Sequence, residues 1–133
     1  MSRQYLNAII IQNDAKTLVA QAETLGRQLA KERLSTSQIR NIFGSVRRIE
    51  MNWPEHPQSD ADHERVRKAQ RELLLLKPKM AYQAKRERGR GVKELTDVLS
   101  EAIDLVDGER KNFQNFVDFC EATLAYHKAA GGS

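Results

Sequence analysis

The sequence STSQIRNIFGSVRRIEMNWP at residues 35–54 decides the fold class. Apolar residues recur there every three or four positions, which is the period of an amphipathic α-helix; they are Ile39, Ile42, Phe43, Val46 and Ile49. Ser35 or Thr36 is suited to cap the start of this helix, because a hydroxyl oxygen can accept from an unpaired backbone N–H. Trp53-Pro54 ends it, since the residue before a proline avoids the α region. The stretch predicts a helix that packs against other helices.

The same period extends over nearly all of the chain. It predicts helices from Asp14 to Ala30, from Asp60 or Asp62 to Leu76, and over residues 92–106 and 113–125. Asn13 is the predicted N-cap of the first of these. Pro78 either kinks the helix before it or begins a new helix as its first residue.

The remaining segments are short. Residues 54–62, PEHPQSDAD, are the predicted loop, and we expect residues 1–12 and 129–133 to fray. No segment alternates convincingly with the period of a β-strand. The sequence therefore predicts an all-α protein, a compact bundle of five to six helices in a single domain over residues 1–133.

The charge is distributed unevenly along the 133 residues. The formal net charge is +4, but residues 1–93 carry +9 and residues 94–133 carry −5. A basic body suggests a polyanionic partner. The alternative is a solubility surface that is merely uneven.

Several classes of protein are not favoured. One cysteine, Cys120, cannot form an internal disulfide, so we expect a cytoplasmic protein. The longest apolar runs are far shorter than a membrane span, and residues 1–5 lack a signal-peptide pattern. We therefore expect no membrane association.

The sequence shows no pattern of a catalytic or metal site. The three histidines, His56, His63 and His127, form no HxxxH motif, and no CxxC motif exists. Cys120 and His127 could share a helix face as a nucleophile and base. Cys120 is better interpreted as a small apolar residue of the last helix. We predict a non-enzyme without cofactor or metal.

Basic residues follow one edge of the helix at 35–54. Arg40, Gly44 and Arg47 form a stripe beside its apolar face, and the two arginines lie about 10 Å apart along the axis. Gly44 has no side chain, so a nucleic-acid backbone could approach closely there. Close packing against another helix is the alternative explanation for this glycine.

A second basic stretch runs from Lys77 to Lys93. At 100° per residue, Met80, Ala81 and Ala84 point inward, whereas Lys79, Tyr82, Gln83 and Arg86 point away from them. Such a surface can hold phosphates without reading a sequence. Tyr82 could instead pack against a neighbouring helix with its hydroxyl bonded. A third basic group, residues 65–71, is interpreted as a solvated face because Glu64 and Glu72 neutralise part of its charge.

Three segments resemble a known family. Residues 35–42, STSQIRNI, resemble a T-S-x-I-R-N-I segment of the small subunit of the type III-A CRISPR (Csm) interference complex, the Csm2 family. Residues 76–84, LKPKMAYQA, are similar to its L-x-P-K-x-A-Y segment, which an arginine follows, here Arg86 or Arg88. Residues 116–132 resemble its F-x-x-F-x-E-A-x-x-A-Y-H-K close. The segments before Leu34 and in the loop 54–62 match nothing.

The resemblance implies a non-catalytic helical subunit that contacts guide and target RNA. It also implies association with other Csm subunits and self-association by stacking, with a homodimer as a further form. Carried over by motif position, the RNA contacts are Arg40, Lys77, Lys79, Arg86 and Arg88. Charge geometry alone adds Arg47, Arg48, Lys85 and Arg90. A helical protein–protein adaptor without direct RNA contact is the alternative function.

Overall fold

The structure is a computed structural model that describes residues 3–87 and 89–132. The described residues form six α-helices and no strand, which confirms the predicted all-α bundle. The helices are α1 (Tyr5–Ile10), α2 (Ala15–Lys31), α3 (Thr36–Asn52), α4 (Asp60–Glu87), α5 (Arg90–Val106) and α6 (Arg110–Ala129).

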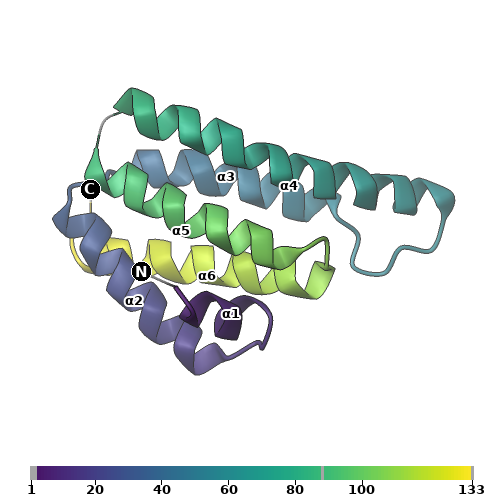
Figure 1. Cartoon of the computed structure of the whole chain (residues 1–133), viewed down its shortest axis with the longest axis horizontal. Helices are drawn as coiled ribbons and strands as arrows, with labels where there is room; N and C mark the ends of the chain where they lie inside the picture. The colour runs from purple at the N-terminus through teal and green to yellow at the C-terminus, as the bar shows by residue number, and fades with distance from the viewer. Residues whose placement is uncertain (1–2, 88, 133) are drawn as a thin grey trace.

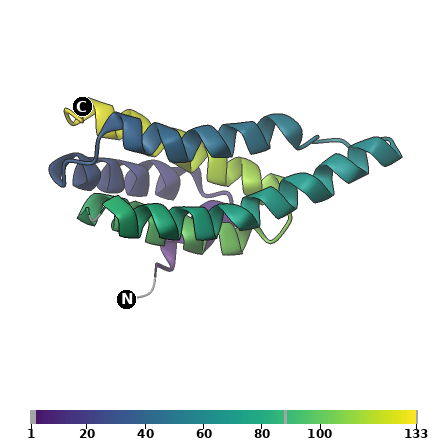
Figure 2. The ribbon, with the colours of Figure 1, turned by 90° about the horizontal axis from the view of Figure 1, so that it is seen from above.

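Four of the helices form a bundle, and the other two cover one side of it. In the ring α3–α4–α5–α6, each helix contacts the next, and α6 contacts α3. The pair α1 and α2 packs on α5 and α6, so α4 lies at the opposite edge of the molecule (Figure 1). No helix of the described residues therefore covers the outer side of the α3–α4 pair. Seen from above, α3 and α4 run side by side in opposite directions (Figure 2).

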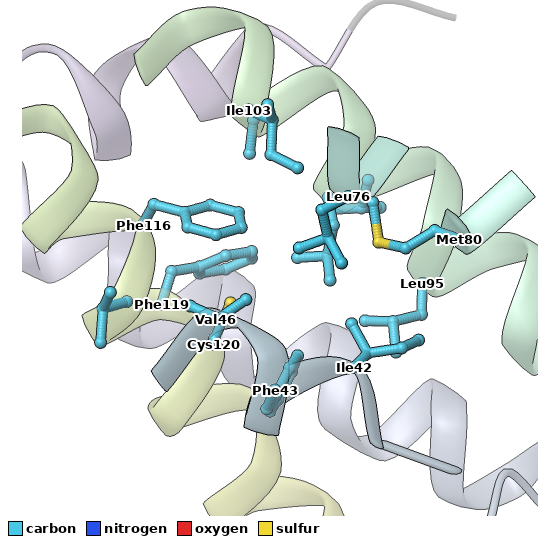
Figure 3. Packing of buried hydrophobic residues seen from close by; sticks show 14 of the residues in the cluster. Ile42, Phe43, Val46, Leu76, Met80, Leu95, Ile103, Phe116, Phe119 and Cys120 are labelled. Carbon is cyan, nitrogen blue, oxygen red and sulfur yellow. The ribbon is translucent and has the colours of Figure 1, made fainter. Parts of the chain in front are cut away.

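The centre of the core lies between the four helices of the ring, and buried residues of α1 and α2 extend it against α5 and α6. Ile42 and Phe43 of α3, Met80 of α4 and Phe116 of α6 meet there, each at most 6% exposed (Figure 3). At the end where α3 leads into the loop, the Trp53 ring stacks on Phe113 with a centroid distance of 4.7 Å. Apolar burial on this scale is the main force that holds the helices together.

The start of α3 is fixed by its own sequence. The Ser35 hydroxyl oxygen accepts from the Gln38 backbone N–H, and the Gln38 side chain accepts from the Ser35 N–H. This reciprocal capping box satisfies two backbone donors that the first turn would otherwise leave unpaired. It selects Ser35, rather than Thr36, as the N-cap.

The long helix α4 continues through Pro78. A proline inside a helix removes one backbone donor and leaves the carbonyl four residues earlier, here that of Leu74, without its partner. Both residues lie on the exposed side of α4, so water can satisfy that carbonyl. Of the two predicted outcomes, a kinked helix and a new helix, the structure shows one helix that ends at Glu87.

The amino-terminal segment differs from its prediction. Instead of fraying, residues 5–10 form α1, with Leu6, Ile9 and Ile10 completely buried. Arg3 pairs with Glu101 at 3.4 Å, which ties this end to α5. The N-cap of α2 is Asp14, whose side chain accepts from the Thr17 N–H.

Three further expectations need correction. Asn13 does not cap α2; it adopts a positive φ of 57°, a conformation that asparagine tolerates in turns. The predicted loop 54–62 is three residues too long, because α4 begins at Asp60, the earlier of its two predicted starts. Ala81 is exposed, not inward, because it lines the open groove between α4 and α5 rather than the core.

The carboxyl-terminal end is held by α2 and by the connection from α2 to α3. α6 extends to Ala129, and the buried His127 ring donates from Nε2 to the Leu34 carbonyl at 2.6 Å. Gly26 of α2 lies directly against α6 at Tyr126. This contact between α2 and α6 leaves α3 and α4 free on the other side of the molecule.

Candidate nucleic-acid interface

The start of α3 and the second half of α4 lie at the same end of the molecule. Ile42 near the start of α3 and Met80 in the second half of α4 meet in the core (Figure 3). Asn52 at the end of α3 instead shares a groove with Lys68 in the first half of α4. The two helices are therefore antiparallel, and this places Arg40 at the same end as residues 76–87.

These segments contain cations and no carboxylate. Residues 35–49 and 73–86 together carry seven basic residues and no Asp or Glu; the seven are Arg40, Arg47, Arg48, Lys77, Lys79, Lys85 and Arg86. Any neutralising charge must therefore come from other parts of the fold. The positive potential of this surface therefore depends on which of the seven cations pair with carboxylates from other parts of the fold.

Two of the seven cations are paired across helices. Arg47 pairs with Glu121 of α6, and it also lies 3.7 Å from Glu50 on its own helix. Lys77 pairs with Asp104 of α5. These predicted RNA contacts are partly neutralised, a fact that sequence spacing could not reveal because their partners are 74 and 27 residues away.

The other five are exposed and have no ion pair within the described part of the chain. Arg40, Arg48, Lys79, Lys85 and Arg86 belong to this group. Arg48 donates to the Ser45 hydroxyl at 3.1 Å, which leaves its charge uncompensated. Arg90, the first residue of α5, is exposed as well, while Arg88 lies outside the described residues.

The outer seam between α3 and α4 brings several of these cations together. Asn52, Lys68 and Glu72 line a groove of about 120 Å³ on this seam. Arg48 precedes Asn52 by one helical turn, and Lys79 and Arg86 follow Glu72 at intervals of seven residues. Since seven residues are almost two full turns, Lys79 and Arg86 continue the same edge of α4. The seam therefore carries Arg48, Lys79 and Arg86.

The remaining cations lie on neighbouring edges. Arg47 lines a groove between α3 and α6, and Arg40 is two turns before it on that edge. Lys77 and Lys85 line the groove between α4 and α5. The predicted contacts thus follow three edges of one uncovered surface, rather than a single row.

Gly44 lies between the arginines of α3. In the order Arg40, Gly44, Arg48, each residue follows the last by four positions, so the three form one ridge. A β carbon added at Gly44 would meet no atom within 4 Å. Close packing against another helix therefore does not explain this glycine, whereas open space beside two arginines suits an approaching backbone.

A model of the family described as Csm2 Type III-A matches residues 12–133. The chain belongs to the Csm2 Type III-A family. It is thus a small subunit of the type III-A Csm complex and associates with the other subunits of that complex. Comparison with curated proteins and with solved structures gives no match.

The family match covers all of α2 to α6 and begins after α1. It includes residues 12–34 and the loop 54–62, which the three sequence segments had left unassigned. The Csm2 fold of this chain therefore comprises the four-helix ring and α2. Helix α1 adds three buried side chains to the core from outside the matched region.

A surface feature of this Csm2 subunit was missed from the sequence. Leu74 and Leu75 are 58% and 43% exposed, in addition to Tyr82, which is 67% exposed and was predicted to point away from the core. The signal was present in the run of four leucines at 73–76, because a helix with one buried face cannot hide four consecutive side chains. Tyr82 is not packed against a neighbouring helix, contrary to the alternative considered for it.

Cys120 and His127 occupy separate structural roles. Burial raises the pKa of the Cys120 thiol, which disfavours the thiolate that a nucleophile requires. The His127 Nε2 is engaged by the Leu34 carbonyl. Their surroundings fit the interpretation of Cys120 as a core residue, with His127 joining α6 to the start of α3.

Two features are absent from the described residues. No helix among them is long and apolar enough to cross a membrane. No cluster of three or more His, Cys, Asp or Glu side chains suited to a metal ion occurs in the part of the chain that the structure describes.

Proposed function

We propose that this Csm2 subunit binds the backbone of guide and target RNA through the outer surface of α3 and α4, without catalysing a reaction. The observation that carries the proposal is the charge of this surface. Five exposed cations on two packed helices have no carboxylate partner among the described residues, and no acidic residue occurs in either segment.

The chemistry of the surface favours phosphates over bases as the main ligand. Lysine and arginine side chains on exposed helix edges reach phosphate oxygens, and each contact releases counterions from the nucleic acid. Such contacts fix position but carry no sequence information. We therefore expect binding that is independent of sequence and weakens steeply as the salt concentration rises.

Stacking of copies is the second part of the proposal. Residues 94–133 carry a net charge of −5, and Glu101 and Asp118 are exposed on the α5 and α6 side of the molecule. The basic α3–α4 surface and this acidic side are complementary, which favours a head-to-tail arrangement along RNA. A homodimer of the isolated chain remains a proposal of the same kind.

Charge reversal tests the RNA interface. Arg40→Glu and Arg86→Glu should each weaken binding to every RNA sequence alike and reduce the dependence of log K on log salt by roughly one unit per lost phosphate contact. Arg27→Glu is the matched control, because Arg27 is exposed on α2 and pairs with Glu23 at 2.6 Å. Filter binding at several salt concentrations provides the measurement.

The result that contradicts the proposal is equally specific. If Arg40→Glu and Arg86→Glu leave RNA affinity unchanged, while the subunit still joins the Csm complex, the basic surface does not bind RNA. The protein would then act as a helical adaptor that contacts only other protein subunits.

A further inference from the structure

The outer side of α4 presents a row of apolar side chains to solvent. We call this the α4 apolar row; it consists of Leu74, Leu75, Pro78, Ala81 and Tyr82, all exposed. Their spacing places them on one side of the helix, opposite Leu76 and Met80, which enter the core. A row of this kind on a soluble surface usually marks a binding site.

Tyr82 is the most exposed aromatic side chain of the row. The residue is 67% exposed, and its hydroxyl makes no hydrogen bond within the described residues. The Arg86 guanidinium carbon lies 5.8 Å from the ring centroid, within the range of a cation–π contact. This arginine stays on the surface next to the ring, so a flat ligand stacked on Tyr82 would also meet a positive charge.

Cations flank the row on both sides. Lys79 and Arg86 lie along the edge toward α3, and Lys85 lies along the edge toward α5. No carboxylate occurs between Leu73 and Arg86. Two copies of this row could not pair symmetrically without bringing like charges together, which disfavours a second α4 as the occupant.

The ligand that matches this pattern is a single-stranded nucleic acid. Its bases offer flat apolar faces, and its phosphates supply negative charge on either side. Aromatic side chains stack on any base, so the site needs no specific sequence. A paired duplex keeps its bases inside and could contact the cations but not the ring.

We propose that the α4 apolar row binds unpaired RNA bases, with Tyr82 as the stacking platform and Lys79, Lys85 and Arg86 holding the flanking phosphates. The inference rests on the proposed function and adds to it that the bound RNA includes bases free of a duplex. It assigns to Tyr82 a role that charge alone does not predict.

Comparison of a base-containing and a base-free ligand tests the inference. The full chain should bind oligo(A) more tightly than an abasic ribose-phosphate oligomer of equal length and charge. Tyr82→Ala should weaken oligo(A) binding by roughly 5- to 150-fold and leave abasic binding unchanged. Tyr82→Phe should retain the preference, and Met51→Ala, which truncates a 78% exposed side chain of α3, should have no effect.

A fluorescent variant supplies an independent measurement. Tyr82→Trp should show quenched emission on binding oligo(A) but not on binding the abasic oligomer. The native Trp53 is only 3% exposed, so its emission serves as an internal reference. Equal quenching by both ligands would overturn the inference.

The outcomes separate this inference from the proposed function. If Arg40→Glu weakens binding to both ligands but Tyr82→Ala changes neither, RNA binding stands and base stacking is wrong. If Tyr82→Ala abolishes the base preference but charge reversal has no effect, the backbone interface is wrong. If Tyr82→Ala leaves RNA affinity intact but prevents assembly with other Csm subunits, the row is a protein contact and the inference is overturned.

Discussion

Gly26 of α2 lies so close to Tyr126 of α6 that a β carbon on the glycine would stand 2.7 Å from the tyrosine Cβ. The same added atom would lie 2.8 Å from the His127 nitrogen and from the Thr123 carbonyl oxygen. Because two of these three neighbours are backbone atoms, they cannot move aside as a flexible side chain can. The α2–α6 contact therefore depends on this glycine.

We predict that Gly26→Ala destabilises the protein. Alanine favours a helix over glycine by about 1 kcal/mol, but forcing an atom into packed backbone typically costs about 1–3 kcal/mol or more. Because all three contacts would be under 3.0 Å, we expect the cost to lie at the upper end and the free energy of unfolding to fall by a net of about 2 kcal/mol in urea denaturation. If the Gly26→Ala protein is instead more stable than the native protein, α2 can shift away from α6 without loss of stability.

Gly44→Ala should have the opposite effect on stability and an additional effect on RNA. A β carbon at Gly44 meets nothing within 4 Å, so the alanine should add roughly 0.5–1 kcal/mol to the free energy of unfolding. If RNA approaches between Arg40 and Arg48, the added methyl should nevertheless weaken RNA binding. Denaturation and filter binding on the same variant test both parts, and a more stable protein with unchanged RNA affinity would remove Gly44 from the interface.

The sequence predicts those parts of the fold that depend on local pattern. The apolar period of α3, its start at Ser35 and its end at Trp53 all follow from residues within one or two turns of each other. Helix α1 was missed because six residues are too few to show a period, and its burial comes from contact with α5, α2 and α6. Packing against the other helices stabilises α1, rather than the helix propensity of its own six residues.

The residues of the candidate site also differ in whether local pattern or tertiary packing determines their exposure and pairing. Exposure of Arg40, Lys79 and Arg86 could be predicted, because each lies outside the apolar stripe of its own helix. The pairing of Lys77 with Asp104 could not, because it depends on how α5 packs beside α4. The exposure of Leu74 depends likewise on the absence of a helix over the outer side of α4.

Cys120 should resist thiol reagents in the folded protein. The side chain is only 2% exposed, and burial raises the pKa of its thiol, so the reactive thiolate is scarce even in mildly alkaline buffer. Raising the pH from about 7 to 9 should accelerate the modification of the urea-unfolded chain but not of the native chain, as an absorbance assay for thiols can measure. Rapid modification of the native protein at pH 7 would support a reactive cysteine instead.

The N-cap of α2 should make stability depend on pH in acid. The Thr17 backbone N–H and then the Thr17 hydroxyl donate to Asp14, and these bonds hold the pKa of its carboxyl below the ordinary value of 3.8. The unfolded chain therefore binds a proton more readily, and stability from this group is present above pH 3.8 and is lost as the pH falls through the lower folded pKa.

Asp14→Ala should thus be less stable than the native protein at pH 6, and the difference should shrink as the pH approaches 2. Asp14→Asn is the matched control, because asparagine caps a helix about equally well but does not titrate. Urea denaturation at several pH values provides the measurement. A deficit of Asp14→Ala that stays constant down to pH 2 would show that the charge of the carboxylate is not involved.

Lys77 and Lys79 provide the sharpest comparison within the proposed RNA interface. Both lie on α4 two residues apart, in the segment at 76–84 that resembles the Csm2 family, with Lys79 at the lysine of the L-x-P-K-x-A-Y pattern and Lys77 at its variable position. Lys77 is paired with Asp104, whereas Lys79 is exposed on the seam with no ion pair among the described residues.

Lys79→Gln should therefore weaken RNA binding several-fold and lower the slope of log K against log salt by about one unit. Lys77→Gln should affect RNA binding less, since Asp104 holds the Lys77 side chain in the groove between α4 and α5, away from the seam that carries Lys79. Denaturation first shows whether both variants are folded, and salt-dependent RNA binding is then measured on each. Equal losses of affinity would mean that the Lys77–Asp104 pair opens when RNA binds. A larger loss for Lys77→Gln would place the RNA on the α5 side of α4.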